Sequence, residues 1–257
     1  MVSILKNDLY RFGKSKLLYG ILFLTFLIAF ALTMIIRQDI RLGISVFGNL
    51  MAFRGVDDVI RIGLAYYNGL GIFVAILLSV FIGQEYQWKT WQHKWITNKS
   101  RVRIYLSKFA LSSIISSIIF LVFQAVILFG SNQAENILTA EYAAMVISGV
   151  AIYAALGASI CLLSMLIKNS TASIIACLGF VLFSETIASV IGNIGNISET
   201  AASVVGWIIR HSIYGMATVV SGTAISWSLA VGIAVNALVI MALSTAVGIL
   251  VFRRYEL

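Results

Sequence analysis

The sequence predicts an all-α membrane protein with six transmembrane helices, and three observations lead to that fold class. Of the 257 residues, 60% are hydrophobic and only 11% are charged, whereas a soluble domain is about 25% charged. The charged residues separate long uncharged runs, and about 20 mostly apolar residues are enough to cross a bilayer. No segment shows the alternating pattern of a β-strand. These features exclude a water-soluble globular enzyme, a disordered chain, a coiled coil and a disulfide scaffold.

The first expected helix is an amphipathic segment over residues 2–16, ahead of the first span. Apolar side chains recur at helical spacing at Ile4, Leu5, Leu9 and Phe12. The charged side chains are expected on the opposite side, at Lys6, Asp8, Arg11 and Lys14. Such a helix would lie in the cytoplasmic interface of the membrane. The alternative is a plain basic flank of the first span.

Six apolar runs are each expected to form one transmembrane helix, within a single transmembrane domain over residues 1–257. Their bounds are about 17–36, 62–84, 109–131, 142–167, 171–191 and 227–252. Residues 192–226 are less regular: 192–196 favour a turn, and 201–209 and 213–220 are apolar but too short to span. We expect short outer helices there, before the sixth span.

The distribution of Lys and Arg predicts the orientation, because cytoplasmic loops carry an excess of both. With a cytoplasmic N-terminus, 13 of the 18 Lys and Arg residues lie inside and 5 lie outside. We therefore expect a multi-pass membrane protein with both termini in the cytoplasm. The net charge of +8 comes from the flanks of the spans, so no nucleic acid partner is expected.

Motifs for nucleotide, metal or cysteine chemistry are missing from the sequence. There is no G-x-x-x-x-G-K-[ST], no H-E-x-x-H and no C-x-x-C. His93 and His211 fall on opposite sides of the membrane in this topology, and Cys161 and Cys177 lie within apolar runs. We expect no catalytic residue, no metal and no cofactor in this chain. An ion-coupled carrier stays an alternative, although such proteins normally bury carboxylates or His at mid-membrane depth.

The loop after the second span is the most informative segment. Trp88, Trp91 and Trp95 recur at i, i+3 and i+7, on one face of a helix, with Tyr86, Lys89 and Lys94 among them. One interpretation is an aromatic belt with lysines reaching the lipid headgroups. The other is a helix that docks a protein partner, since aromatic residues are favoured at interfaces.

The same loop resembles that of the membrane subunits of type-2 ATP-binding-cassette transporters. In those permeases the loop opens with Glu and an aromatic residue, continues through Thr and an amphipathic segment to Ser-Arg, and ends at a Lys that opens the third span. The matching residues in this chain are Glu85, Tyr86, Thr90, Ser100, Arg101 and Lys108. The chain departs from the pattern at residues 97–99, which read Thr-Asn-Lys where many members have a Pro.

The resemblance implies the permease subunit of an ATP-driven exporter, without enzymatic activity of its own. It implies two ATPase subunits that bind ATP and Mg, and a second permease that is an identical copy or a paralogue. Residues 85–96 would form the coupling helix that docks on the ATPase. The coupling residues would be Glu85, Tyr86, Trp88, Lys89, Trp91, Lys94 and Trp95.

The short chain is similar in size to Gram-positive exporters of membrane-active peptides, including lantibiotic-immunity permeases and phenol-soluble-modulin exporters. This resemblance implies an amphipathic peptide as the substrate. We expect the path to be lined by Tyr66, Tyr67, Asn68 and Phe73 on the second span and by Phe180, Phe183 and Glu185 on the fifth. Ordinary bundle packing is the alternative role for these residues.

A row of small and polar residues in the last span predicts close helix packing, because small side chains let membrane helices approach. The row consists of Gly232, Asn236, Ser244 and Gly248. The competing function for the whole chain is a non-transport scaffold or sensor, whose Trp-rich loop would bind the membrane surface or a regulator.

Overall fold

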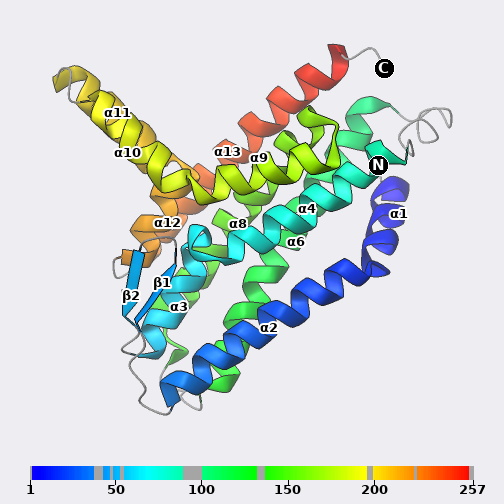
Figure 1. Ribbon diagram of the computed structural model, residues 1–257. Coiled ribbons are helices and arrows are strands. Elements are labelled where there is room, and N and C mark those ends of the chain that lie inside the picture. Colours follow the sequence, from blue (N-terminus) through cyan, green and yellow to red (C-terminus); the bar gives the residue numbers. More distant parts are fainter. Residues whose placement is uncertain are drawn as a thin grey trace.

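The computed structural model describes residues 2–37, 43–46, 49–52, 55–88, 100–131, 137–195, 199–222 and 225–254. Figure 1 shows a bundle of long helices with a pair of short helices that extends away from it. In chain order the elements are α1 (Val2–Gly13), α2 (Lys16–Arg37), β1 (Gly43–Val46), β2 (Asn49–Ala52), α3 (Val56–Leu64), the 3-10 helix η1 (Tyr66–Asn68), α4 (Leu70–Gln87), α6 (Arg101–Gly130), α8 (Ala140–Ile167), α9 (Ser170–Leu182), α10 (Ser184–Gly195), α11 (Glu199–His211), α12 (Ile213–Gly222) and α13 (Trp227–Arg254).

The chain is a helical membrane protein. Among the described residues, five helices are long and apolar enough to cross a bilayer, namely α2, α4, α6, α8 and α13. A sixth span results if the bent pair α9 and α10 counts as one. The start of α1 and the end of α13 lie at the same end of the bundle, where α4 ends and α6 begins (Figure 1).

Close contact between α6 and α8 forms the centre of the bundle. A Cβ atom added at Gly157 would lie 2.3 Å from the Ser116 Oγ and 2.5 Å from the Ser112 carbonyl oxygen. The Ser116 hydroxyl donates to the Tyr153 carbonyl at 2.6 Å, and the Tyr153 ring stacks on Phe120 at 4.9 Å between centroids. Small residues therefore bring these two helices together and allow a hydrogen bond between them.

Three spans begin and end close to their expected bounds: α2 for 17–36, α8 for 142–167 and α13 for 227–252. The expected third span, 109–131, begins earlier in the structure, because α6 starts at Arg101. Ser100 is the N-cap of α6, and its hydroxyl accepts from the Arg103 amide. An N-cap Ser satisfies one of the free amides at a helix start, so helix α6 extends through the basic residues that flank its apolar run.

The expectation of one continuous helix over 62–84 is wrong. Helix α3 ends at Leu64, η1 follows, and α4 begins only at Leu70, after Gly69 with φ of +145°. That backbone conformation is open to glycine and strained for other residues. The Tyr153 hydroxyl donates to the Gly63 carbonyl at 2.7 Å, and the Gln124 amide donates to the Ile60 carbonyl at 3.1 Å. Side chains of α6 and α8 thus satisfy backbone groups at the break, as a membrane protein requires.

The fifth expected span, 171–191, is also not one straight helix. Helices α9 and α10 meet at Phe183 with a bend of 58°. The buried Ser184 hydroxyl donates to the Val181 carbonyl at 2.9 Å, a local bond that competes with the helical ladder. The turn expected at 192–196 is wrong as well, because α10 continues to Gly195. The expected short helices at 201–209 and 213–220 are present as α11 and α12.

Two further elements differ in detail from expectation. The N-terminal helix is present as α1, but its buried face runs through Ile4, Asp8 and Phe12, and Leu9 is exposed. The sequence shows no strand pattern, but the described residues include two short strands. Strand β1 pairs antiparallel with β2, with Ile44 opposite Met51. Ile44 and Val46 are β-branched residues, which favour strands over helices. In the sequence, this short ribbon lies between α2 and α3.

Candidate functional site

A cluster of four charged side chains lies where α1, α4 and α6 meet. The Lys108 ammonium of α6 is 3.1 Å from the Asp8 carboxylate of α1 and 2.5 Å from the Glu85 carboxylate of α4. The Arg11 guanidinium of α1 is 2.7 Å from the same Glu85 oxygen. Two cations therefore balance two anions. We call Asp8, Arg11, Glu85 and Lys108 the ion cluster.

The ion cluster is buried beneath an aromatic ring. Glu85 and Lys108 have no exposed surface and Asp8 is 2% exposed, while the side chain of Arg11 is 35% exposed. The Arg11 guanidinium and the Lys108 ammonium lie 4.4 and 4.5 Å from the centroid of the Phe81 ring. Phe12 of α1 packs edge-on against the same ring. Each cation thus has both a carboxylate and an aromatic face as partners.

Burial makes the pairing of these four groups energetically important. Moving an ion out of water costs several kcal/mol, and a nearby opposite charge offsets that cost only when the geometry is good. The Ser107 hydroxyl adds a bond to Asp8 at 3.4 Å, and Arg11 donates to the Phe81 carbonyl at 3.3 Å. The cluster therefore holds α1 against α4 and α6 and disfavours states in which α1 moves away alone.

The residue that follows Glu85 joins α4 to another helix. The Tyr86 hydroxyl donates to the Met165 carbonyl, at the end of α8, at 3.2 Å. Earlier in the same turn, a Cβ added at Gly83 would lie 2.5 Å from the Ser170 Cα at the start of α9. The end of α4 thus contacts four other helices within four residues. The Glu-aromatic pair seen in the sequence is part of this junction.

The expected coupling residues divide into three groups. Glu85 is fully buried and Tyr86 is half-buried, and both bond to neighbouring helices of the bundle. Trp88 follows the end of α4 and is 62% exposed, available to a partner or to lipid. The remaining members lie outside the described residues: Lys89, Trp91, Lys94 and Trp95.

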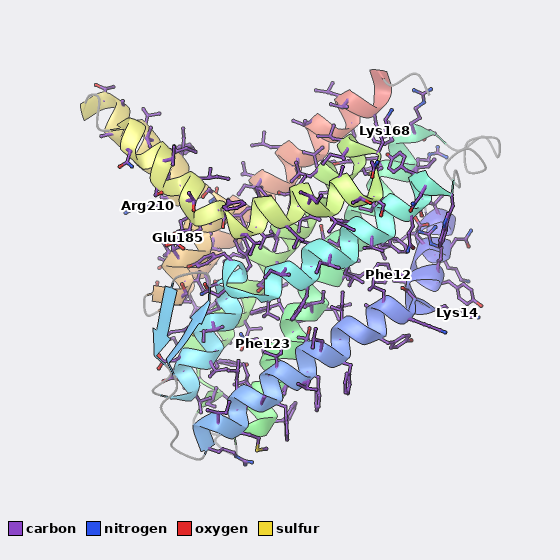
Figure 2. All side chains as sticks on the ribbon, in the orientation of Figure 1. Phe12, Lys14, Phe123, Lys168, Glu185 and Arg210 are labelled. Carbon is purple, nitrogen blue, oxygen red and sulfur yellow. The ribbon has the colours of Figure 1, made fainter. Side chains whose placement is uncertain are left out.

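The residues expected along the path do not form one surface. Tyr66 and Phe180 share a cavity between η1, α9 and α13. Tyr67 contacts Tyr214 of α12, with ring centroids 5.1 Å apart. Asn68 and Phe73 are half-buried, and Phe183 and Glu185 are exposed. In Figure 2 Glu185 lies near Arg210, where the α10–α11 pair leaves the bundle, and Lys168 lies at the other end of α9.

The small-residue row on α13 faces several surroundings. A Cβ at Gly248 would lie 2.1 Å from the Tyr105 ring, and the Ser244 carbonyl accepts from the Tyr105 hydroxyl at 3.1 Å. Asn236 donates to the His211 carbonyl at 2.9 Å, whereas a Cβ at Gly232 would meet nothing within 4 Å. Close approach to α6 is thus restricted to one end of the row.

Sequence reasoning missed both α1 members of the ion cluster. Asp8 and Arg11 were expected on the polar, exposed side of the amphipathic helix. The spacing Ile4, Asp8, Phe12 follows one helix face at steps of four, and that face is buried. An acidic residue on the apolar face of a basic segment was the available signal. Sequence reasoning also missed Trp207 and Tyr214, which line the cavity beside Tyr66.

Comparisons with known proteins leave the family open. No protein-family model matches the chain, and no curated protein matches it. Among the described residues, no three His, Cys, Asp or Glu side chains gather as metal ligands would.

Proposed function

We propose that this chain is the transmembrane subunit of a type-2 ATP-binding-cassette exporter. In this proposal the chain crosses a bacterial plasma membrane six times, with α9 and α10 as the bent fifth span and both termini in the cytoplasm. It pairs with a second permease and recruits two separate ATPase subunits. Residues 85–96 dock on the ATPase, which binds ATP and Mg.

The ion cluster is the observation that carries the proposal. Helix α4 ends and helix α6 begins on the two sides of the Trp-rich loop, and Lys108 and Glu85 join them at 2.5 Å. Asp8 and Arg11 add α1 to the same unit. A displacement of the loop by an ATPase would therefore move α1, α4 and α6 together, as one body. Rigid-body motion of this kind is how packed elements transmit a local displacement.

A loop that only lay on the membrane would not need this connection. An aromatic belt gains its stability from the headgroup region, and it places no demand on buried charges one turn below. The scaffold or sensor function explains the tryptophans equally well, but it leaves the ion cluster only the structural role of holding α1, α4 and α6 together. For the exported substrate, an amphipathic membrane-active peptide remains our proposal, on the resemblance alone.

Replacing Trp91 tests the docking role of the loop. The tagged chain is extracted in mild detergent from its own host, and the nucleotide-binding subunit that co-purifies is quantified. We expect equal amounts of the two proteins for the native chain and loss of the ATPase for Trp91→Ala, because buried aromatic anchors carry most of the energy of an interface. Half-exposed Trp227 at the start of α13 is the control, and Trp227→Ala should keep the ATPase.

Two results would contradict this proposal. If Trp91→Ala is folded, inserted and still bound to its ATPase, residues 85–96 are not the docking helix. If the native chain carries no ATPase at all, a membrane-surface helix explains the loop better, and transport that follows an ion gradient without ATP would favour the carrier.

A further inference from the structure

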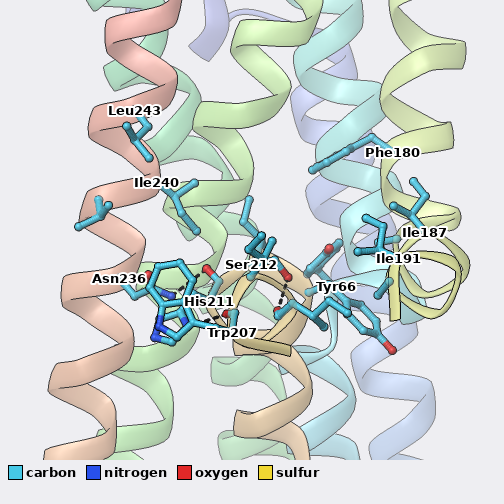
Figure 3. Close-up of a pocket in the computed structure, with 17 residues that line it drawn as sticks. Tyr66, Phe180, Ile187, Ile191, Trp207, His211, Ser212, Asn236, Ile240 and Leu243 are labelled. Carbon is cyan, nitrogen blue, oxygen red and sulfur yellow. Dashed lines mark hydrogen bonds between the residues drawn. The ribbon is translucent and has the colours of Figure 1, made fainter. Parts of the chain in front are cut away.

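A cavity of about 450 Å³ lies between α13 and the α9–α10 bend. Figure 3 shows α13 on one side, Phe180 and α10 on the other, and α12 across one end. Phe180 is ten residues after the start of α9, or about 15 Å along a helix, roughly half the thickness of the hydrocarbon core. Ile240 is likewise about 20 Å from the start of α13.

The walls of the cavity are mostly apolar, and several of the polar groups among them bond within the protein. Asn236 donates to the His211 carbonyl at 2.9 Å, and His211 Nδ1 hydrogen-bonds the Trp207 carbonyl at 2.8 Å. The Ser212 hydroxyl donates to the Ile209 carbonyl at 2.6 Å (Figure 3). Because most of the lining is hydrophobic or aromatic, the cavity favours an apolar occupant.

We expect the cavity to open sideways toward lipid, because several of its lining residues are about half exposed: Ile187, Trp207, Ile208, Val239 and Leu243. They belong to α10, α11 and α13 and are all apolar or aromatic. A molecule in the bilayer can therefore reach the cavity without crossing a polar barrier.

The volume of the cavity limits what it can hold. One turn of an α-helix with side chains is about 10–12 Å wide and 5.4 Å long, which is roughly 400–600 Å³. The cavity thus has room for about one turn, too little for an amphipathic peptide helix. It lies within the range of about 300–1,000 Å³ that small-molecule sites occupy. A flexible hydrocarbon chain fits both its size and its lining.

We propose that this cavity binds one hydrocarbon chain of an amphiphile, which enters from the side through the bilayer. The chain belongs to a membrane lipid or to a free single-chain amphiphile such as a fatty acid. This binding site lies within one subunit, and its occupancy requires no ATPase. The site can therefore be tested independently of the proposed transport function.

Photolabelling of the full chain in phosphatidylcholine nanodiscs tests this site. One probe is phosphatidylcholine with a diazirine in one acyl chain, and the other is palmitic acid with a mid-chain diazirine. We expect at least one probe to give saturable adducts on cavity residues of α10, α11 and α13, located by mass spectrometry of peptides. Adducts from the first probe assign a lipid acyl chain, and adducts from the second assign a free single-chain amphiphile.

Matched variants separate the cavity from general lipid contact. Ala188→Phe projects into the cavity, while Val190→Phe lies on the exposed side of the same helix. Added bulk in a filled site weakens binding by about tenfold or more, so Ala188→Phe should lose the saturable adducts and Val190→Phe should keep them. On α13, Ile240→Phe and exposed Leu238→Phe form a second pair. If Ala188→Phe does not fold, this pair tests the site: Ile240→Phe should lose the saturable adducts and Leu238→Phe should keep them. Non-saturable adducts spread over α2 and α13, or equal labelling within each folded pair, would overturn the proposal.

Discussion

A Lys108→Met variant is expected to lose about 3–5 kcal/mol of folding free energy, the usual cost of removing one member of a buried ion pair. The variant leaves the Asp8 and Glu85 carboxylates with Arg11 as their only cationic partner in the ion cluster, and Arg11 is partly exposed. The thermal unfolding midpoint of the purified chain in detergent should fall by roughly 10 °C. Limited trypsin digestion should also cleave at Arg11, because α1 detaches.

Two companion variants identify the cause of that loss. Lys6→Met removes an exposed lysine from α1 and should leave both the midpoint and the resistance of Arg11 to trypsin unchanged. The double variant Glu85→Gln with Lys108→Met leaves one anion, Asp8, and one cation, Arg11, in the ion cluster, so we expect it to recover part of the stability. Together with the single variant Glu85→Gln, it measures the coupling between the two sites. If Lys108→Met behaves like Lys6→Met, the ion cluster does not hold α1 in place.

A Gly157→Val variant is expected to lose about 3 kcal/mol or more, at the upper end of the usual cost of overpacking. A Cβ at Gly157 would lie 2.5 Å from the Ser112 carbonyl oxygen, and a backbone atom cannot rotate away as a side chain can. Helices α6 and α8 must then separate, which breaks the bond from Ser116 to the Tyr153 carbonyl. Size-exclusion chromatography in detergent should show loss of the monodisperse protein.

The same substitution at Gly232 is the control for that variant. A Cβ at Gly232 meets nothing within 4 Å, and valine is a better helix former than glycine. Gly232→Val should therefore leave the elution profile and the midpoint nearly unchanged. Equal stability of the two valine variants would mean that α6 and α8 are further apart than described.

The bounds of three spans could be predicted because uncharged length alone decides where a helix can enter a bilayer. Residues 17–36, 142–167 and 227–252 agree with α2, α8 and α13 to within two residues at each end. A count of apolar residues does not register backbone geometry, however. The break between α3 and α4 depends on Gly69 and on carbonyl groups that bond to Tyr153 and Gln124. Partners that distant along the chain are not part of any local pattern.

The candidate site could be predicted only in part, for a related reason. The loop motif marked Glu85 and Lys108, which are 23 residues apart, but it did not indicate that the two side chains bond to each other. Nothing local shows that Asp8 completes the ion cluster across 99 or 100 residues of chain. Helical periodicity placed Asp8 among exposed polar residues because aspartate is normally exposed, and its buried position depends on a lysine in another helix.

The mass of the intact complex from the native host tests the central claim most directly. The chain is purified in mild detergent and measured by native mass spectrometry without prior dissociation. The proposed function predicts two permease subunits, both copies of this chain or one of them a paralogue, together with two nucleotide-binding subunits. A folded chain that is found alone, or only with copies of itself, would contradict it.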